Sequence, residues 1–434
     1  MSSAERAARP FDRRALLLGS AAGLAAGCAS TARSTSGAPV AGSDAWHALF
    51  ADLADQSARW QPISPAEKKP RLARAARVLA ACGVDALLVE PGATMDWFSG
   101  VSWGRSERLF ALVVLADASA FWILPSFEQS MAEKRIAVGG PVAPLVPWEE
   151  HEYAFEPLAA ALRARGVERL ALDPSARAFV VARTAEAFGP ARVRVGLDVV
   201  RELRATKDAR ELELLRAACE LTQRAIRAVA ERLEAGLTDH ELGAWVTSAQ
   251  AKLGLSDTWC LPLLGPSAAA PHGEPEGRAL AEGLGVLVDT GGALHGYQSD
   301  ITRTWHFGPR AEPEFLRAWA TVQAAQQRAF ERMRPGVECR AIDAAAREVV
   351  AAAGYPGGYA VFGHRLGHGI GLEGHEEPYF DGGNALPLAP GMTFSDEPGL
   401  YLPGRLGVRL EDIVAITAEG AQVFGSWQES PARP

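Results

Sequence analysis

The stretch GHRLGHGIGLEGHEEP, at positions 363–378, contains three of the nine histidines of the 434-residue chain, namely His364, His368 and His375. Imidazoles bind metals and carry protons near neutral pH, so this clustering indicates chemistry. The spacing of His364 and His368 would place both on one face of a helix, as zinc helices do. The intervening glycines oppose a helix, because each costs about 1 kcal/mol in a helix interior. We therefore expect a strand-and-loop segment that walls a cleft, the alternative being structural histidines near a turn.

Carboxylates form a second group of candidate residues. Two strand pairs around glycine-rich turns each carry two of them: Asp289 and Asp300 within residues 285–308, and Glu397 and Glu411 within residues 391–414. In the second pair, the strand period of two puts Arg409 and Glu411 on one face and Asp396 and Asp412 on the other. We therefore take Glu397 and Glu411 as the inward-facing acids.

Four carboxylates that share one cleft would repel each other unless a cation lies among them. For any single acid, a solvated side chain is the simpler explanation, but the whole set predicts a metal site. With one imidazole added, the donors suffice for two divalent ions that share carboxylates at about 3.5–4 Å, as in two-metal hydrolytic sites. Carboxylate and water ligands suit Mn²⁺, and a mixed set also holds Zn²⁺ or Co²⁺.

The elements that must position these residues alternate between helix and strand. Residues 70–100 predict an amphipathic helix and then a buried strand over about 85–90, and residues 109–125 predict two strands around a turn. Helix-then-strand patterns follow in residues 156–174 and 183–200, before a long helix that ends at Gly236. We expect an α/β fold with a domain boundary near residue 205.

Composition narrows the range of functions. A hydrophobic content of 48% predicts a sizeable core, and a net charge of −8 excludes the basic footprint of a nucleic-acid-binding protein. Partners are expected to be small molecules or peptides. Four scattered cysteines lack the spacing of a metal motif and are expected to be buried and unpaired: Cys82, Cys219, Cys260 and Cys339.

The first forty residues have the order of an export signal, with a basic start, an apolar run and then small residues. The run from Ala15 to about Ala26 is too short to span a bilayer. Arg13 and Arg14 directly before it resemble a twin-arginine signal. The sequence LAAGC, ending at Cys28, resembles a lipoprotein cleavage box, with its leucine one position farther from the cysteine than usual. We expect a periplasmic or envelope-associated protein with a lipid anchor at Cys28 as an option, the alternative being a disordered basic tail.

The motifs VDTG…GYQSDITRT, HRLGHGIGLEGHEEP and DEPGLY…GVRLED, in this order, resemble the pita-bread metallopeptidases, specifically the branch of proline dipeptidase and aminopeptidase P. The resemblance covers residues from about 205 to 425, and the preceding region resembles the creatinase-type amino-terminal domain of that family. It implies an α/β (α+β) fold with a creatinase-like domain over 41–204 and a pita-bread catalytic domain over 205–434, which follow the export signal and linker expected over 1–40 from the leader itself.

Site roles follow from this resemblance, residue by residue. The five metal ligands of the family fall on Asp289, Asp300, His368, Glu397 and Glu411. Its catalytic and substrate-binding residues outside the ligand set fall on His272, His375, His364, Arg409 and Tyr401. The related creatinase does not keep the ligand set, so the full set here argues against metal-free chemistry.

Two positions depart from the family pattern. Where relatives often have Gly-x-Asn before His272, this chain has GPSAAAPH, which is expected to reshape the substrate pocket. Where they often have an apolar residue before Glu397, it has Asp396, which either supports the ligands from behind or is solvated.

The activity implied by the resemblance is hydrolysis of the peptide bond before proline, by a dipeptidase or an aminopeptidase that uses two divalent ions, with manganese favoured. Glu397 is implied as a catalytic proton acceptor and donor, His375 as an oxyanion stabiliser, and His272 and Arg409 as substrate-positioning residues. A homodimer or homotetramer is also implied. The alternatives are a metal-dependent hydrolase or lyase for a small non-peptide molecule on the same scaffold, and a non-catalytic binding module.

Overall fold

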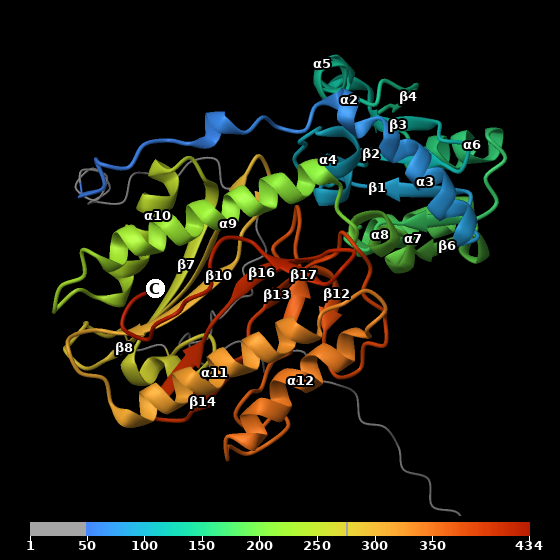
Figure 1. Cartoon of the computed structure of the whole chain (residues 1–434). Helices are drawn as coiled ribbons and strands as arrows, with labels where there is room; N and C mark the ends of the chain where they lie inside the picture. Colours follow the sequence, from blue (N-terminus) through green and yellow to red (C-terminus); the bar gives the residue numbers. More distant parts are fainter. Residues whose placement is uncertain (1–48, 275–276) are drawn as a thin grey trace, which may run out of the picture. The chain divides into compact units, whose positions relative to one another are not determined.

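The first part of the chain is built on one mixed six-stranded sheet with the order β4-β3-β2-β1-β5-β6 (Figure 1). Its strands are β1 (Ala86–Val89), β2 (Ala111–Leu115), β3 (Ala120–Pro125), β4 (Leu145–Trp148), β5 (Leu170–Leu172) and β6 (Val193–Val195). β2 is antiparallel to β1 and to β3, whereas the other neighbours are parallel. The central strands are apolar and buried along their whole length, as expected for a sheet covered on both faces.

Helices connect and cover these strands. They are α2 (Pro65–Lys68), α3 (Pro70–Ala81), α4 (Ala93–Ser99), α5 (Gln129–Gly139), α6 (Phe155–Ala164), α7 (Ala178–Phe188) and α8 (Leu197–Arg204), with short 3-10 turns at Ser57–Arg59, Ser126–Glu128 and Pro190–Arg192. The helix and strand alternation expected from residues 70–200 is therefore confirmed.

The coordinates are a computed structural model that describes residues 49–274 and 277–434. The expected export signal, with Arg13, Arg14 and Cys28, lies outside these residues. Within the described ranges, no helix is both long enough and apolar enough to cross a membrane.

The second part contains two larger sheets and one hairpin. The first sheet has the order β10-β8-β7, with β9 paired to β8, and consists of β7 (Ser256–Leu264), β8 (Gly285–Leu294), β9 (Tyr297–Gln298) and β10 (Ile301–His306). The second has the order β12-β11-β13-β16-β17, and consists of β11 (Gly367–Gly369), β12 (Glu376–Phe380), β13 (Thr393–Asp396), β16 (Asp412–Ile416) and β17 (Ala421–Val423). β14 (Gly399–Leu402) and β15 (Leu406–Arg409) form the hairpin.

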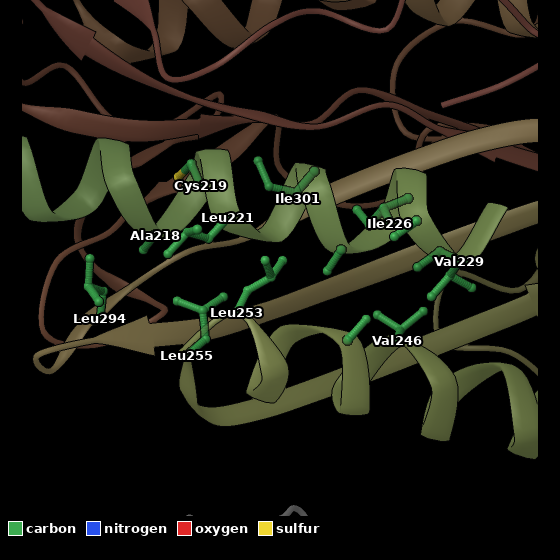
Figure 2. Packing of buried hydrophobic residues seen from close by; sticks show 14 of the residues in the cluster. Ala218, Cys219, Leu221, Ile226, Val229, Val246, Leu253, Leu255, Leu294 and Ile301 are labelled. Atoms are coloured by element: carbon green, nitrogen blue, oxygen red, sulfur yellow. The ribbon is translucent and has the colours of Figure 1, made fainter. Parts of the chain in front are cut away.

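Two helix pairs cover these strands, α9 (Ala209–Ala230) with α10 (Asp239–Lys252), and α11 (Pro313–Arg332) with α12 (Cys339–Ala352). Figure 1 shows α9 and α10 on one side of the strands and α11 and α12 on the other. One apolar core joins α9 and α10 to β8 and β10, and a second joins α11 and α12 to the hairpin and the second sheet. Figure 2 shows α9 side chains such as Leu221 and Ile226 in the first core.

Local sequence explains where these helices start. Asp208 caps α9 and Thr238 caps α10, each in a capping box with a glutamate three residues later. The expected end of α9 at Gly236 was wrong, because the helix stops at Ala230 and a non-helical turn follows. The four cysteines of the described chain are free, as expected, but the expected burial holds only for Cys219 and Cys339 and was wrong for Cys82 and Cys260, which are partly exposed.

Candidate metal centre

The four candidate carboxylates come from separate strands or strand ends. Asp289 lies within β8, and Asp300 immediately precedes β10, the antiparallel neighbour of β8. Glu397 immediately follows β13, and Glu411 lies in the short break between β15 and β16. The backbone of Glu411 ties the two sheets together, since its N–H donates to the carbonyl of Thr302 at 3.0 Å. The expected antiparallel arms that carry the acids are confirmed.

His368 is the fifth member and lies in the short strand β11. A register shift between His368 and Gly369 bulges the strand, a device that re-aims side chains next to functional sites. Glycines flank it because neighbouring backbone is too close for a side chain. A Cβ at Gly367 would lie 2.0 Å from the Ser395 carbonyl oxygen, and one at Gly369 would lie 2.5 Å from that of Glu376. Close backbone approach is therefore the reason for the glycine-rich sequence, as expected.

The His368 ring presents one nitrogen to the carboxylates. Its Nδ1 faces the carbonyl oxygen of Gly369 at 3.1 Å, and this contact requires the proton on Nδ1. Nε2 is then a free acceptor that lies 3.6 Å from Oδ2 of Asp300, 3.4 Å from Oε1 of Glu397 and 3.9 Å from Oε1 of Glu411. Burial lowers the pKa of His368 to about 3, with His375 adding to the effect, so the ring is neutral and able to bind metal.

Ligand atoms converge in three overlapping groups, within each of which the atoms lie within 4.8 Å of one another. The groups are Asp289, Asp300 and Glu411; His368, Glu397 and Glu411; and Asp300, His368 and His375. Together the first two groups contain all five residues that the family resemblance assigns as ligands, and Glu411, which belongs to both, links them into one site. The third group offers His375 as a further donor.

Charge and hydrogen bonding show that this site fits divalent cations. Oδ1 of Asp289 and Oδ1 of Asp300 are buried and receive no hydrogen bond from any donor among the described residues. Burial and neighbouring acids raise the pKa of Asp300 and of Glu411 well above the ordinary range, and burial raises the pKa of Glu397 to about 8. A bound cation would coordinate the buried oxygens that lack a hydrogen-bond donor. It would also neutralise carboxylates that cannot all be ionised without it.

Hydroxyl side chains that the sequence analysis did not select hold two of the acids. Thr302 donates from Oγ1 to Oε2 of Glu411 at 2.7 Å. Ser395 donates from Oγ to Oε1 of Glu397 at 3.2 Å and accepts the backbone N–H of His368 at 2.9 Å. The signal that could have found Thr302 is strand parity, because it follows Asp300 by two residues and so shares its face.

Arg409 is buried behind Asp289. Its Nη2 donates to Oδ2 of Asp289 at 2.7 Å, and its Nε donates to Oγ1 of Thr302 at 3.2 Å. Nη1 donates to the carbonyl of Pro271 at 3.2 Å and to the hydroxyl of Tyr401 at 2.9 Å. Four of its five N–H groups are thereby used within the protein, so most of its bonding capacity orients the site.

His364 is linked to this group through Tyr401. Its Nε2 lies 2.8 Å from the Tyr401 hydroxyl, and its Nδ1 lies 2.8 Å from the carbonyl of Arg365. The carbonyl fixes the proton on Nδ1, so the tyrosine hydroxyl donates to Nε2. Burial lowers the pKa of His364 to about 3, with Arg409 adding to the effect, which keeps the ring neutral.

The remaining candidates lie at the exposed side of the site. His375 is exposed and stacks on His368, with ring centroids 3.8 Å apart. His272 is also exposed, in the loop after the 3-10 turn Gly265–Ala269. Neither has a hydrogen bond among the described residues, so both rings have nitrogens free for a ligand.

Behind the ligands is a buried polar layer. Asp396 is fully buried, which excludes a solvated role, and neither of its carboxylate oxygens has a partner in the described chain. It pairs across β13 and β16 with Asp412, whose carboxylate accepts from Arg303 at 2.6 Å, from Gln326 at 3.2 Å and from Gln223 at 3.1 Å. The expected separation of faces is therefore observed: Glu411 faces the site and Asp412 faces this layer.

Comparison with known proteins agrees with this arrangement. Residues 213–418 match Metallopeptidase family M24, and residues 71–206 match the Creatinase/Prolidase N-terminal domain. The chain is 38% identical over 353 residues to the probable dipeptidase PepE of Mycobacterium tuberculosis, an alignment that covers 81% of this chain and 92% of the relative. It is 29% identical to the Xaa-Pro dipeptidase of Pyrococcus furiosus, over 82% of this chain and 97% of the relative.

The crystal structure of dipeptidase PepE from Mycobacterium ulcerans has the same fold, with a TM-score of 0.79 and 34% identity over 86% of this chain and 99% of that chain. The pita-bread catalytic fold and the creatinase-like domain expected from the motifs are thereby confirmed. The chain belongs to metallopeptidase family M24.

Proposed function

We propose that this metallopeptidase hydrolyses the peptide bond before proline, in Xaa-Pro dipeptides or in peptides with proline in second position. The observation that carries the proposal is the convergence of four carboxylates and the free Nε2 of His368 on one site. The dipeptidase and Xaa-Pro dipeptidase names of the relatives support the substrate class.

Five residues would hold two divalent cations: Asp289, Asp300, His368, Glu397 and Glu411. Manganese is the proposed metal, because four of the five donors are carboxylates and oxygen ligands suit Mn²⁺. When bound, such cations polarise a substrate carbonyl and lower the pKa of water, which supplies a nucleophile at neutral pH.

The protein's own groups would orient the substrate and move the proton. Glu397 is the proposed acceptor of the proton from the attacking water and its donor to the leaving amine. Its carboxylate accepts a hydrogen bond from Ser395 at 3.2 Å, which helps to hold its orientation. His375, which is exposed and stacks on His368, is the proposed hydrogen-bond donor to the developing oxyanion.

Substrate positioning is assigned to the residues around Tyr401. The neutral His364, the Tyr401 hydroxyl and Arg409 form one hydrogen-bonded row beside Asp289, and His272 lies on the exposed side. A proline residue is compatible with a binding surface formed by these side chains, because proline has no N–H that would need a hydrogen-bond partner and its φ is fixed. A rigid substrate loses little conformational freedom on binding.

A substrate panel tests this proposal. Metal-loaded protein is assayed with Xaa-Pro dipeptides, with Xaa-Pro peptides of three to five residues, and with matched peptides that carry alanine in place of proline. We expect kcat/KM to be highest for one of the two proline sets, which also decides between a dipeptidase and an aminopeptidase. Equal rates on proline and alanine peptides would contradict the specificity for proline. No hydrolysis of any peptide would contradict the whole proposal and favour a small non-peptide substrate.

We also infer, from sequence alone, export to the periplasm or cell envelope through the twin-arginine signal at Arg13 and Arg14, with Cys28 as the candidate lipidation site. A homodimer or homotetramer is the proposed assembly, and sedimentation of the purified protein tests it.

A further inference from the structure

The loop that carries His364 needs external support. It spans residues 353–366, between the end of α12 and the start of β11, and contains no helix or strand. Gly354, Gly357, Gly358 and Gly363 lie within it, and most side chains from 353 to 360 are exposed. Glycine-rich backbone has the largest conformational freedom to lose, so the loop's own sequence does not fix it.

One side chain of α12 supplies that support with every donor it has. Arg347 donates from Nη1 to the carbonyls of Gly358 at 3.1 Å and Phe362 at 2.6 Å, and from Nη2 to the carbonyl of His364 at 2.6 Å. Its Nε and the second N–H of Nη2 donate to the two oxygens of Asp343 at 2.7 and 2.9 Å. All five N–H groups of the guanidinium are thus used, three of them on loop carbonyls.

Asp343 completes the arrangement from the same helix, four residues earlier. Its Oδ1 also accepts the backbone N–H of Leu366 at 3.0 Å, at the far end of the loop. Arg347 is 9% exposed and Asp343 is 2% exposed. The rings of Tyr359 and Phe362 lie against the guanidinium, with centroids 3.7 and 4.2 Å from its central carbon. A buried bidentate pair of this kind is strong and geometrically specific.

The held backbone determines where the His364 ring lies. Its Nε2 receives the Tyr401 hydroxyl proton, and the same hydroxyl accepts from Arg409, which in turn holds Asp289. A shift of the His364 backbone would therefore break the hydrogen bond from Tyr401 to His364, while Arg409 would still hold Asp289, and neither Asp343 nor Arg347 belongs to any of the candidate ligand groups.

We propose that Asp343 and Arg347 are a positioning pair that fixes the 353–366 loop so that His364 meets Tyr401 at the substrate wall. This role rests on the function proposed above for His364. The pair acts on substrate recognition through the loop backbone, and it leaves the metal ligands in place.

Arg347→Lys and Arg347→Met test the pair in the full-length, Mn²⁺-loaded protein. Lysine keeps the charge and has only three N–H groups on one nitrogen, so it cannot bond Asp343 and three carbonyls at once. We expect kcat/KM on the best Xaa-Pro substrate to fall for both variants, by roughly 10²-fold for methionine, as for other misplaced active-site groups. Bound metal per chain should match that of the wild type.

A double-mutant cycle distinguishes a positioning role of Arg347 from a general loss of structure in its variants. In the His364→Ala background, Arg347→Lys should change kcat/KM by no more than about twofold, because the group it positions is gone. Asp343→Asn should reproduce the Arg347→Lys effect. Arg340→Lys is the matched control, since Arg340 is an exposed arginine of the same helix that pairs only with Glu338 in the described chain.

The outcomes are distinct. The proposed role of the pair is overturned if Arg347→Lys lowers kcat/KM by the same factor with and without His364. It is also overturned if the variants lose bound metal, or if they keep the wild-type kcat/KM while His364→Ala lowers it. If His364→Ala itself has no effect, the role of His364 fails and the positioning pair fails with it. Absence of Xaa-Pro hydrolysis in the metal-loaded wild type would overturn the proposed function instead.

Discussion

The buried Arg409 and the partly buried Asp289 form an ion pair, with Nη2 of the arginine 2.7 Å from Oδ2 of the aspartate. The pair orients the aspartate so that its Oδ1, which has no hydrogen-bond donor among the described residues, is left for the metal centre. A residue that the family resemblance assigns to the substrate is thus also the direct support of a proposed metal ligand.

Removing this support should weaken metal binding. Arg409→Met leaves Asp289 unoriented, and loss of such a partner typically costs 10–100-fold in metal affinity or activity, so we expect an increase in Kd for Mn²⁺ of about that size. The Kd is measured by competition with a chelator. Arg405→Met, in the exposed turn of the same hairpin, is the control and should bind metal normally. An unchanged Kd for Arg409→Met would show that Asp289 needs no such support.

His368 and His375 should respond differently to alanine. His368→Ala removes a proposed ligand, so bound metal and activity should fall together. His375→Ala should keep its metal and lose about 10²–10³ in kcat, as expected when an oxyanion donor is removed. Metal per chain is measured by elemental analysis beside kcat and KM. Because His375 also lies in a candidate ligand group with Asp300 and His368, equal metal loss in both variants would assign it to the metal instead.

Glu376 should make stability depend on acid pH. Its buried carboxylate bonds Nζ of Lys207 at 2.6 Å and the guanidinium of Arg204. Burial alone would raise the pKa of Glu376, but Arg204 and Lys207 hold it below its ordinary value of 4.5. With a depressed folded-state pKa, the stabilisation is present above pH 4.5 and is lost as pH falls through the lower, folded-state value.

Glu376→Gln should therefore lower the free energy of unfolding at neutral pH by roughly 3–5 kcal/mol, because the buried Lys207 loses its ion-pair partner and the buried Arg204 keeps only Glu373. It should also flatten the decline in stability on acidification that the wild type shows. Denaturant unfolding at several pH values measures both effects. Glu377→Gln is the control, since Glu377 has no ion pair in the described chain. If Glu376→Gln keeps the pH dependence of stability that the wild type shows, Glu376 is not the cause of that dependence.

Export is tested by changing Arg13 and Arg14 together to lysine. The double variant should remain in the cytoplasm, because the twin-arginine pair is the feature that the export route reads. Fractionation with immunodetection measures its distribution against the wild type. Normal appearance of the variant in the envelope fraction would exclude the twin-arginine route.

Most of the site could be predicted because its chemistry is local in sequence. Asp289 lies in β8, Asp300 immediately precedes the neighbouring strand β10 after a short connection, and each glutamate adjoins a strand end. The glycines around His368 excluded a helix, and the structure gives the reason, since Ser395 and Glu376 backbone occupy the space of any side chain there.

What the sequence left open depends on long-range contacts. Strand parity placed Asp396 away from the ligands, but only the packing of β13 against β16 shows that it is buried beside Asp412. The sequence does not link Thr302 to Glu411, because 109 residues separate them and only the folded chain brings the hydroxyl to the carboxylate. The four-residue spacing of Asp343 and Arg347 on one helix is compatible with an ion pair, but nothing in the sequence indicates that Arg347 also bonds loop carbonyls.

The central claim is that Asp289, Asp300, His368, Glu397 and Glu411 form a two-metal centre on which peptide hydrolysis depends. The most direct measurement is a titration of metal-stripped protein with Mn²⁺, with bound metal per chain and Xaa-Pro hydrolysis followed together. We predict no activity without metal, recovery as the site fills towards two ions per chain, and no recovery for Asp300→Ala. Full activity in metal-stripped protein, or full recovery of Asp300→Ala, would contradict the account.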